Sequence, residues 1–280
     1  NIAIGCAVCL PTTGGDHQMA IGAGTTMWVT GDNSFNVGIG TTTLLSKLTV
    51  SGGACVTGVI TAANFAKADG SSLGGFSQDS TGTLVAGTGA GAAIDSDTCF
   101  NIMLGCKAGA ALNAGDHNIL LGRYAGCSIT SGINNLAIGN NAGLGLVDGT
   151  YNLLFGKDAG KCMTSGSNNT FVGGNGPGHG SATGISGSDN YAGGYHAMCC
   201  ICSGGCNTAI GRFAGKRITT GTFNVFIGDN IAKCRDMTGN RNVVLGRMSG
   251  NDLTSADDNV AIGAYAGEKL RDGETNVFIG

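Results

Sequence analysis

The densest group of reactive side chains lies at residues 199–206, whose sequence is CCICSGGC. Cysteine thiolates are favoured zinc ligands, but structural zinc sites usually contain two CxxC-like pairs or combine Cys with His at set spacings. The segment has neither form. Free cysteine also behaves as a small buried hydrophobe. We therefore favour core packing for these cysteines, with disulfides in an oxidising compartment and a metal site as the alternatives.

Other residues suggest chemistry only at first sight. Residues 156–162 and 211–217 look like phosphate loops, but three residues separate their glycines and no Ser or Thr follows the lysine, as a P-loop requires. Glutamate occurs only at Glu268 and Glu274, so no carboxylate pair for glycoside cleavage stands out. We expect no catalytic, cofactor-binding or metal-binding residues, no cofactor, and a protein that is not an enzyme.

These segments all belong to one repeat, an Asn followed four residues later by Gly. The steps between successive copies are 17, 17, 17, 17, 21, 17, 17, 18, 17 and 17 residues. A fixed period of this size indicates one structural unit stacked on itself rather than a globular enzyme core. The eleven copies begin at Asn101, Asn118, Asn135, Asn152, Asn169, Asn190, Asn207, Asn224, Asn242, Asn259 and Asn276.

Each copy predicts a short strand, because the residues between Asn and Gly are rich in Val, Ile, Leu and Phe. A second Gly ends most coils, so we expect strand, turn, short second strand and turn in each period. Stacked coils would pair in parallel, ~4.8 Å apart. The Asn side chains could bond the backbone at turns and one another along the axis. The predicted fold is an all-β, fibrous parallel β-solenoid or β-roll of 17-residue coils.

Both faces of the predicted strand are apolar. The first and third residues after the Asn point one way and the second residue points the other way. We expect large third-place residues such as Ile227 to be buried, each stabilising the fold by ~1.5–3 kcal/mol. The opposite face would then be an exposed apolar stripe, which monomers rarely show. Identical chains that pack these stripes together are the partner we expect.

One edge of the coil carries a second recurring pattern. Basic residues recur at the fifth place after the Asn and aromatic residues at the sixth. A solvated outer edge explains both, and a face that contacts host surface glycans is the alternative. The residues are Arg123, Lys157, Arg212, Arg247, Tyr124, Phe213 and Tyr265.

Composition excludes several partners. The chain has 280 residues, with 53 Gly, 2 Pro, 12% charged residues and a net charge of −3. This charge suggests no nucleic-acid partner, and the absence of an 18-residue apolar run suggests no membrane insertion.

We divide the chain into repeats at 1–40, a β-rich connector with a Gly/Ser/Thr-rich linker at 41–97, and the main array at 98–280. Within the array, 173–189 is an irregular loop. Both ends fall inside repeats, so we expect a longer parent protein.

The repeats resemble those of phage tail-fibre proteins, as in NVAIGAYAG at 259–267 and NVFIG at 276–280. The block NVGIGTTT at 36–43, with KLTV at 47–50, VTGVITA at 56–62 and NF at 64–65, resembles a connector in fibres of marine T4-like phages. Leu44 and Leu45 stand where that connector often has Pro. The NVAIG strand is also similar to the head repeats of trimeric autotransporter adhesins, a three-chain β-roll of shorter period.

The resemblance implies a homotrimeric shaft segment of a tail fibre, located in the virion, that supports host attachment. Its partners would be identical chains and other fibre or baseplate proteins. A bacterial surface adhesin or extracellular filament, located at the cell surface, is the alternative. A tailspike-type enzyme would need clustered carboxylates, which the sequence does not show.

Overall fold

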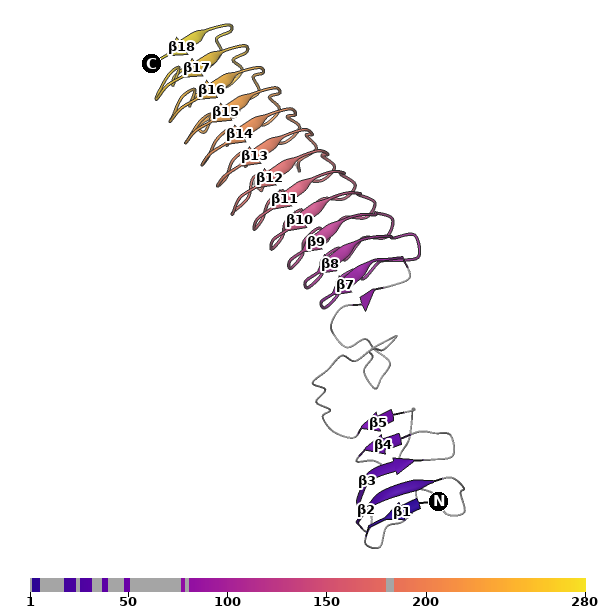
Figure 1. Cartoon of the computed structure of the whole chain (residues 1–280). Coiled ribbons are helices and arrows are strands. Elements are labelled where there is room, and N and C mark those ends of the chain that lie inside the picture. Colours follow the sequence, from indigo (N-terminus) through magenta and orange to yellow (C-terminus); the bar gives the residue numbers. More distant parts are fainter. Residues whose placement is uncertain are drawn as a thin grey trace. The chain divides into compact units, whose positions relative to one another are not determined.

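The computed structural model describes residues 2–5, 18–23, 26–31, 37–39, 48–50, 77–78, 81–179 and 184–280. The chain forms two compact units, Asn1–Phe65 and Ala66–Gly280, whose elements are labelled in Figure 1. The described residues form strands and turns without any helix, which confirms the predicted all-β class. A search of the same residues accordingly finds no helix that could cross a membrane.

The larger unit is a 13-stranded sheet whose strands lie in chain order from β6 to β18. From β7 onward every pair is parallel and each coil contributes one three-residue strand, so the strands stack in a single row (Figure 1). This confirms the predicted parallel β-solenoid. The strands are β6 (Ser77–Gln78), β7 (Leu84–Ala86), β8 (Ile102–Leu104), β9 (Ile119–Leu121), β10 (Leu136–Ile138), β11 (Leu153–Phe155), β12 (Thr170–Val172), β13 (Tyr191–Gly193), β14 (Thr208–Ile210), β15 (Val225–Ile227), β16 (Val243–Leu245), β17 (Val260–Ile262) and β18 (Val277–Ile279).

The register of the sheet follows the sequence period. Leu136 of β10 pairs with Leu153 of β11, one 17-residue step along the chain. At the 21-residue step, Thr170 still pairs with Tyr191 at the start of the next strand. The additional residues of the longer repeat are therefore accommodated in its loops, and the strand ladder continues unchanged.

The repeated Gly ends each strand at a corner that no larger residue fits. At Gly139 the backbone φ is +135°, and a Cβ atom would lie 2.5 Å from the carbonyl oxygen of Gly156 in the next coil. Both the left-handed backbone and the close approach require glycine. This accounts for the Gly four residues after every Asn.

The solenoid core contains the second residue of each strand, and this corrects the expectation that third-place residues are buried. Phe226 is 0% exposed, whereas Ile227 beside it is 41% exposed. The reason is the Asn column, because Asn224 is buried and alternation along a strand puts the second residue on the side of the Asn. Ala at the seventh place and Leu, Ile or Met at the eleventh complete the core, as in Ala125 and Ile129.

A second strand in each coil was also expected, and the structure shows turns there instead. Outside the named strands, the described residues contain three isolated bridges, Met163 with Ile185, Ile218 with Met237, and Asp257 with Glu274. Backbone bonds still join successive coils on this side, as from Thr130 N–H to the Val147 carbonyl at 2.9 Å. The left-handed residues at each corner leave too short an extended stretch for a continuous second ladder.

The smaller unit is a five-stranded sheet of different topology. Its first pair continues the repeat, since Ile2 pairs in parallel with Met19, 17 residues on. The third strand then pairs antiparallel with both neighbours, so the repeats predicted at 1–40 are interrupted by a hairpin. The strands are β1 (Ile2–Ile4), β2 (Met19–Ala23), β3 (Thr26–Gly31), β4 (Val37–Ile39) and β5 (Leu48–Val50).

The array begins earlier than the predicted boundary at residue 98. Strand β7 lies inside the segment 41–97 that was predicted as a connector, yet it pairs in parallel with β8. The connector-like residues 56–62 lie outside the described residues. Of the predicted irregular loop at 173–189, residues 173–179 and 184–189 are described.

Candidate functional site

The outward side of the sheet is an apolar surface, which we call the outer strand face: the first and third strand residues of β8 to β18. Many of these side chains are substantially exposed in the single chain, including Phe155 at 50% and Ile210 at 41%. The full set of exposed large side chains on this face is Ile119, Phe155, Tyr191, Ile210, Ile227, Ile262, Val277 and Ile279.

The outer strand face carries no charged residue at either place in any of the eleven repeats, although 12% of the chain is charged. A solvated sheet face normally alternates with polar side chains, because exposed apolar area is unfavourable in water. A long, mostly apolar strip on an exposed protein surface is typical of an interaction surface. The exposed apolar stripe expected from the sequence therefore exists, but on the face opposite to the one the sequence had indicated.

The basic and aromatic edge is largely occupied by contacts within the chain. The Arg123 guanidinium lies 4.5 Å from the ring centroid of Tyr124, and the Lys233 ammonium lies 4.7 Å from that of Phe213. Arg212 also pairs with Asp229 at 2.9 Å. Because cations already cover faces of these rings, those faces are not free to stack on a sugar. This favours a solvated outer edge over the glycan-binding alternative.

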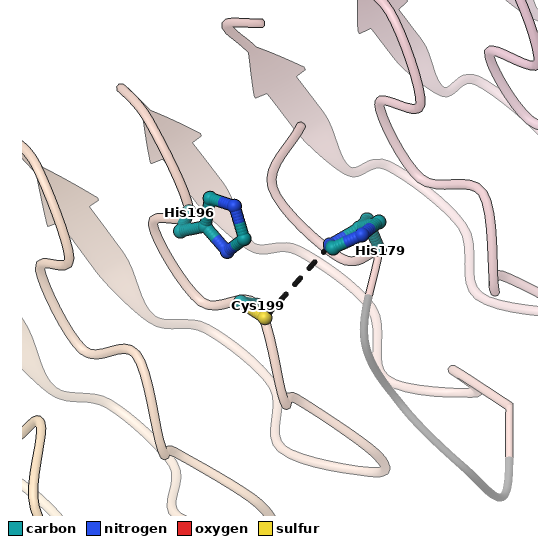
Figure 2. A group of neighbouring side chains, drawn as sticks. All are labelled: His179, His196 and Cys199. Atoms are coloured by element: carbon teal, nitrogen blue, oxygen red, sulfur yellow. Dashed lines mark hydrogen bonds between the residues drawn. The ribbon is translucent and has the colours of Figure 1, made fainter. Parts of the chain in front are cut away.

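A cluster of two histidines and one cysteine lies between two successive coils. His179 follows β12, whereas His196 and Cys199 follow β13, and Figure 2 shows the three side chains close together. One ligand atom from each lies within 4.8 Å of the others. Cys199 Sγ is 4.0 Å from Nδ1 of His179, and the two imidazole rings meet edge to face at 5.1 Å.

The protonation of this cluster is set by burial and by its neighbours. Burial, followed by the charges of His179 and Lys216, lowers the pKa of His196. A hydrogen bond of 3.8 Å joins the Sγ atoms of Cys199 and Cys200. This bond, and then burial, raises the pKa of Cys199, whereas the same bond lowers the pKa of Cys200 to about 6.

The structure separates the cysteines that the sequence groups at 199–206. Cys199 joins the histidines, Cys202 Sγ donates to the Cys200 carbonyl oxygen at 3.5 Å, and Cys206 is exposed. All nine cysteines among the described residues are free thiols. The phosphate-loop look-alikes are coil corners, in which Gly156 and Gly211 are the strand-ending glycines.

The sequence contained a partial signal for the two histidines of the cluster, but none that places Cys199 beside them. His179 and His196 are 17 residues apart, one full repeat. Alignment on the Asn concealed this, because the longer step places His179 tenth after Asn169 but His196 sixth after Asn190.

Comparison with known proteins adds no relative, since no family model, no curated protein and no solved structure matches this chain. The function must therefore be argued from the repeat, the outer strand face and the cluster themselves.

Proposed function

We propose that this chain is a structural shaft segment of a phage tail fibre or a similar virion appendage, in which three identical chains pack through their outer strand faces. Its function is mechanical: it is a stiff spacer that supports host attachment at a distance from the particle. The observation that carries the proposal is the uncharged apolar face, which runs along every coil from β8 to β18.

Stiffness follows from bonds that run along the axis. Backbone N–H groups at the strands and corners bond carbonyl groups of neighbouring coils, as from Gly139 to the Leu121 carbonyl at 2.8 Å. Each coil therefore contacts its neighbours through a backbone ladder and a shared apolar core, as in other solenoids. Bending the rod would break bonds in many coils together.

Assembly accounts for the apolar face. Burial of apolar side chains yields about 25 cal/mol for each Å² removed from water, and a strip with apolar side chains in every coil from β8 to β18 repeats this gain along the array. Three chains, rather than two, is the number implied by the resemblance to trimeric fibre and adhesin repeats. Other fibre or baseplate proteins would then join the ends of the trimer.

The test is the mass of the intact rod in solution, measured by sedimentation for the parent chain and a double variant. Ile210→Lys with Ile227→Lys places two charges on the outer strand face of β14 and β15. We expect the mass of three chains for the parent and a shift toward single chains for the variant. Ala114→Lys with Ser165→Lys is the matched control, because both residues are exposed outside the strands.

A parent chain that sediments as a monomer would overturn the packing, and a dimer would overturn the number three. The location is tested separately, with antibodies against the chain applied to particles that carry its gene. We expect decoration of tail appendages. Labelling of cell surfaces without labelling of particles would favour the adhesin instead.

A further inference from the structure

The His–Cys cluster is not explained by the repeat or by the proposed shaft. It lies at the one 21-residue step among the eleven repeats, where the coil after β12 departs from the common path. Three coils meet there, because Cys162 of the preceding coil donates from Sγ to the His179 carbonyl oxygen at 2.9 Å.

The cluster lacks the hydrogen bonds that a purely structural histidine pair would use. Nδ1 of His196 is buried and has no hydrogen-bond partner among the described residues, and leaving such a group unpaired is costly. Cys199 is 5% exposed, and its 4.0 Å separation from His179 Nδ1 is at the long limit for a bond to sulfur. A metal ion bound by all three side chains would give the buried Nδ1 of His196 a partner.

The donor set and its spacing match a thiophilic ion. Zinc binds sulfur at about 2.3 Å and imidazole nitrogen at about 2.0–2.1 Å, so tetrahedral ligands S and N lie roughly 3.5 Å apart. The Cys199 Sγ to His179 Nδ1 pair would contract by about half an ångström, and any pair near the 4.8 Å limit of the cluster by about one ångström or more. Imidazole and thiolate favour zinc over calcium or magnesium, which prefer oxygen ligands, and the cluster contains no carboxylate.

We propose that His179, His196 and Cys199 bind one zinc ion, which fastens the longest repeat of the array to the coil that follows it. The three side chains are the protein ligands, and a water molecule or a small solute would complete the tetrahedron. Binding replaces the proton of the Cys199 thiol, which is released to solvent as the Zn–S bond forms. The imidazoles bind in their neutral form.

The positive charges of Lys216 and Arg217 would lower the affinity of the site for a cation. Lys216 and Arg217 lie in the next coil, and their positive charges act on His196 and Cys200. Positive charge opposes cation binding, and the thiolate partly offsets it. The Lys216 ammonium also lies 5.1 Å from the centroid of the Phe213 ring.

The test uses the full chain, reduced and stripped of metal, and titrates it first with Co²⁺ as a spectroscopic probe and then with Zn²⁺. We expect one Co²⁺ per chain, tetrahedral d–d bands, a sulfur-to-cobalt charge-transfer band, and loss of all three signals when Zn²⁺ displaces the probe. Cys199→Ser should abolish the charge-transfer band, and His196→Gln should weaken Zn²⁺ binding by more than about tenfold.

Two substitutions elsewhere serve as matched controls. Cys234→Ser removes an exposed thiol, and His117→Gln removes an exposed imidazole that stacks on Phe100. Both should bind Zn²⁺ like the parent chain. Equal binding by the parent and Cys199→Ser, a cobalt spectrum without the charge-transfer band, or dependence on Cys200 instead of Cys199 would each overturn the assignment.

A readout in the parent chain alone avoids any dependence on variant folding. Amide hydrogen exchange, measured with and without Zn²⁺, should slow selectively in residues 173–201, where the ion joins two coils. Residues 84–121, three or more coils away, should exchange at unchanged rates. Uniform slowing along the array, or none, would contradict a local fastening.

Discussion

Asn135 Oδ1 accepts two hydrogen bonds from Asn152 in the next coil, one from its backbone N–H at 3.1 Å and one from its side-chain amide at 3.0 Å. The same pair of bonds joins every consecutive Asn from Asn101 to Asn276, including the pair across the 21-residue step. The Asn column is therefore a continuous side-chain ladder inside the solenoid.

Asn152→Ala should break this ladder within the array. The Asn169 N–H would lose the Oδ1 of Asn152 as its acceptor at 3.0 Å, and the Gly166 carbonyl would lose its amide donor at 2.9 Å. Each buried group left unpaired costs about 1–3 kcal/mol, so we expect a loss of roughly 2–5 kcal/mol in the free energy of unfolding. Urea denaturation followed by circular dichroism measures it.

Asn113→Ala is the control for the ladder, because Asn113 is exposed and lies outside the Asn column. Its midpoint in urea should match that of the parent within error. Equal midpoints for Asn152→Ala and Asn113→Ala would show that the buried column contributes nothing to stability.

Phe226→Ala should destabilise the array more than Ile227→Ala does. Phe226 is fully buried and Ile227 is 41% exposed in the single chain. Removing a buried Phe side chain typically costs about 3–5 kcal/mol, because it leaves a cavity. In the proposed assembly the cost of Ile227→Ala lies in association, so its melting temperature should depend on protein concentration.

The measurement is thermal melting of both variants at a low and a high protein concentration. The difference between Phe226→Ala and the parent should persist at both concentrations. A larger loss for Ile227→Ala than for Phe226→Ala at the low concentration would mean that the two faces have been assigned the wrong way round.

The sequence alone predicted the class, the period and the parallel stacking, because Asn and Gly recur where the chain must turn. It did not settle which face is inside, since both Phe226 and Ile227 are large and apolar. The side chain of Asn224 points into the solenoid, where it makes its buried hydrogen bonds. Because side chains alternate along a strand, the residue two places later, Phe226, points inward as well. A short apolar strand carries no such information by itself.

The His–Cys cluster could not be assembled from the sequence for a related reason. An alignment on the Asn assumes that every repeat follows the same path, and the repeat that contains His179 does not. How four additional residues are distributed around a coil depends on packing against neighbouring coils. Only the structure places His179 beside Cys199.

Lys216→Gln should strengthen zinc binding at the proposed site. The charge of Lys216 acts on both His196 and Cys199, and its removal takes away a repulsion that any bound cation would experience. We expect affinity for Zn²⁺ to rise by about two- to tenfold at low ionic strength. Competition with a zinc-binding dye measures the change.

Lys157→Gln provides the comparison, since this exposed lysine lies in an earlier coil, where its nearest carboxylate is Asp158 at 3.9 Å. It should leave zinc affinity unchanged. If Lys216→Gln weakens binding, Lys216 supports the site and the electrostatic argument fails.

Gly139→Ala should be poorly tolerated, although it adds a single methyl group. The backbone φ is +135°, and the new Cβ would lie 2.5 Å from the Gly156 carbonyl oxygen, which belongs to backbone and cannot rotate away. Strain of this kind costs of order 1–3 kcal/mol before the displaced ladder bonds are counted.

Gly174→Ala is the matched control, because a Cβ there would meet nothing within 4 Å, and its effect should stay within about 0.5 kcal/mol. Denaturant unfolding of the two variants distinguishes them. Equal stability of the two variants would mean that successive coils lie far enough apart at the strand ends to admit a Cβ atom at position 139.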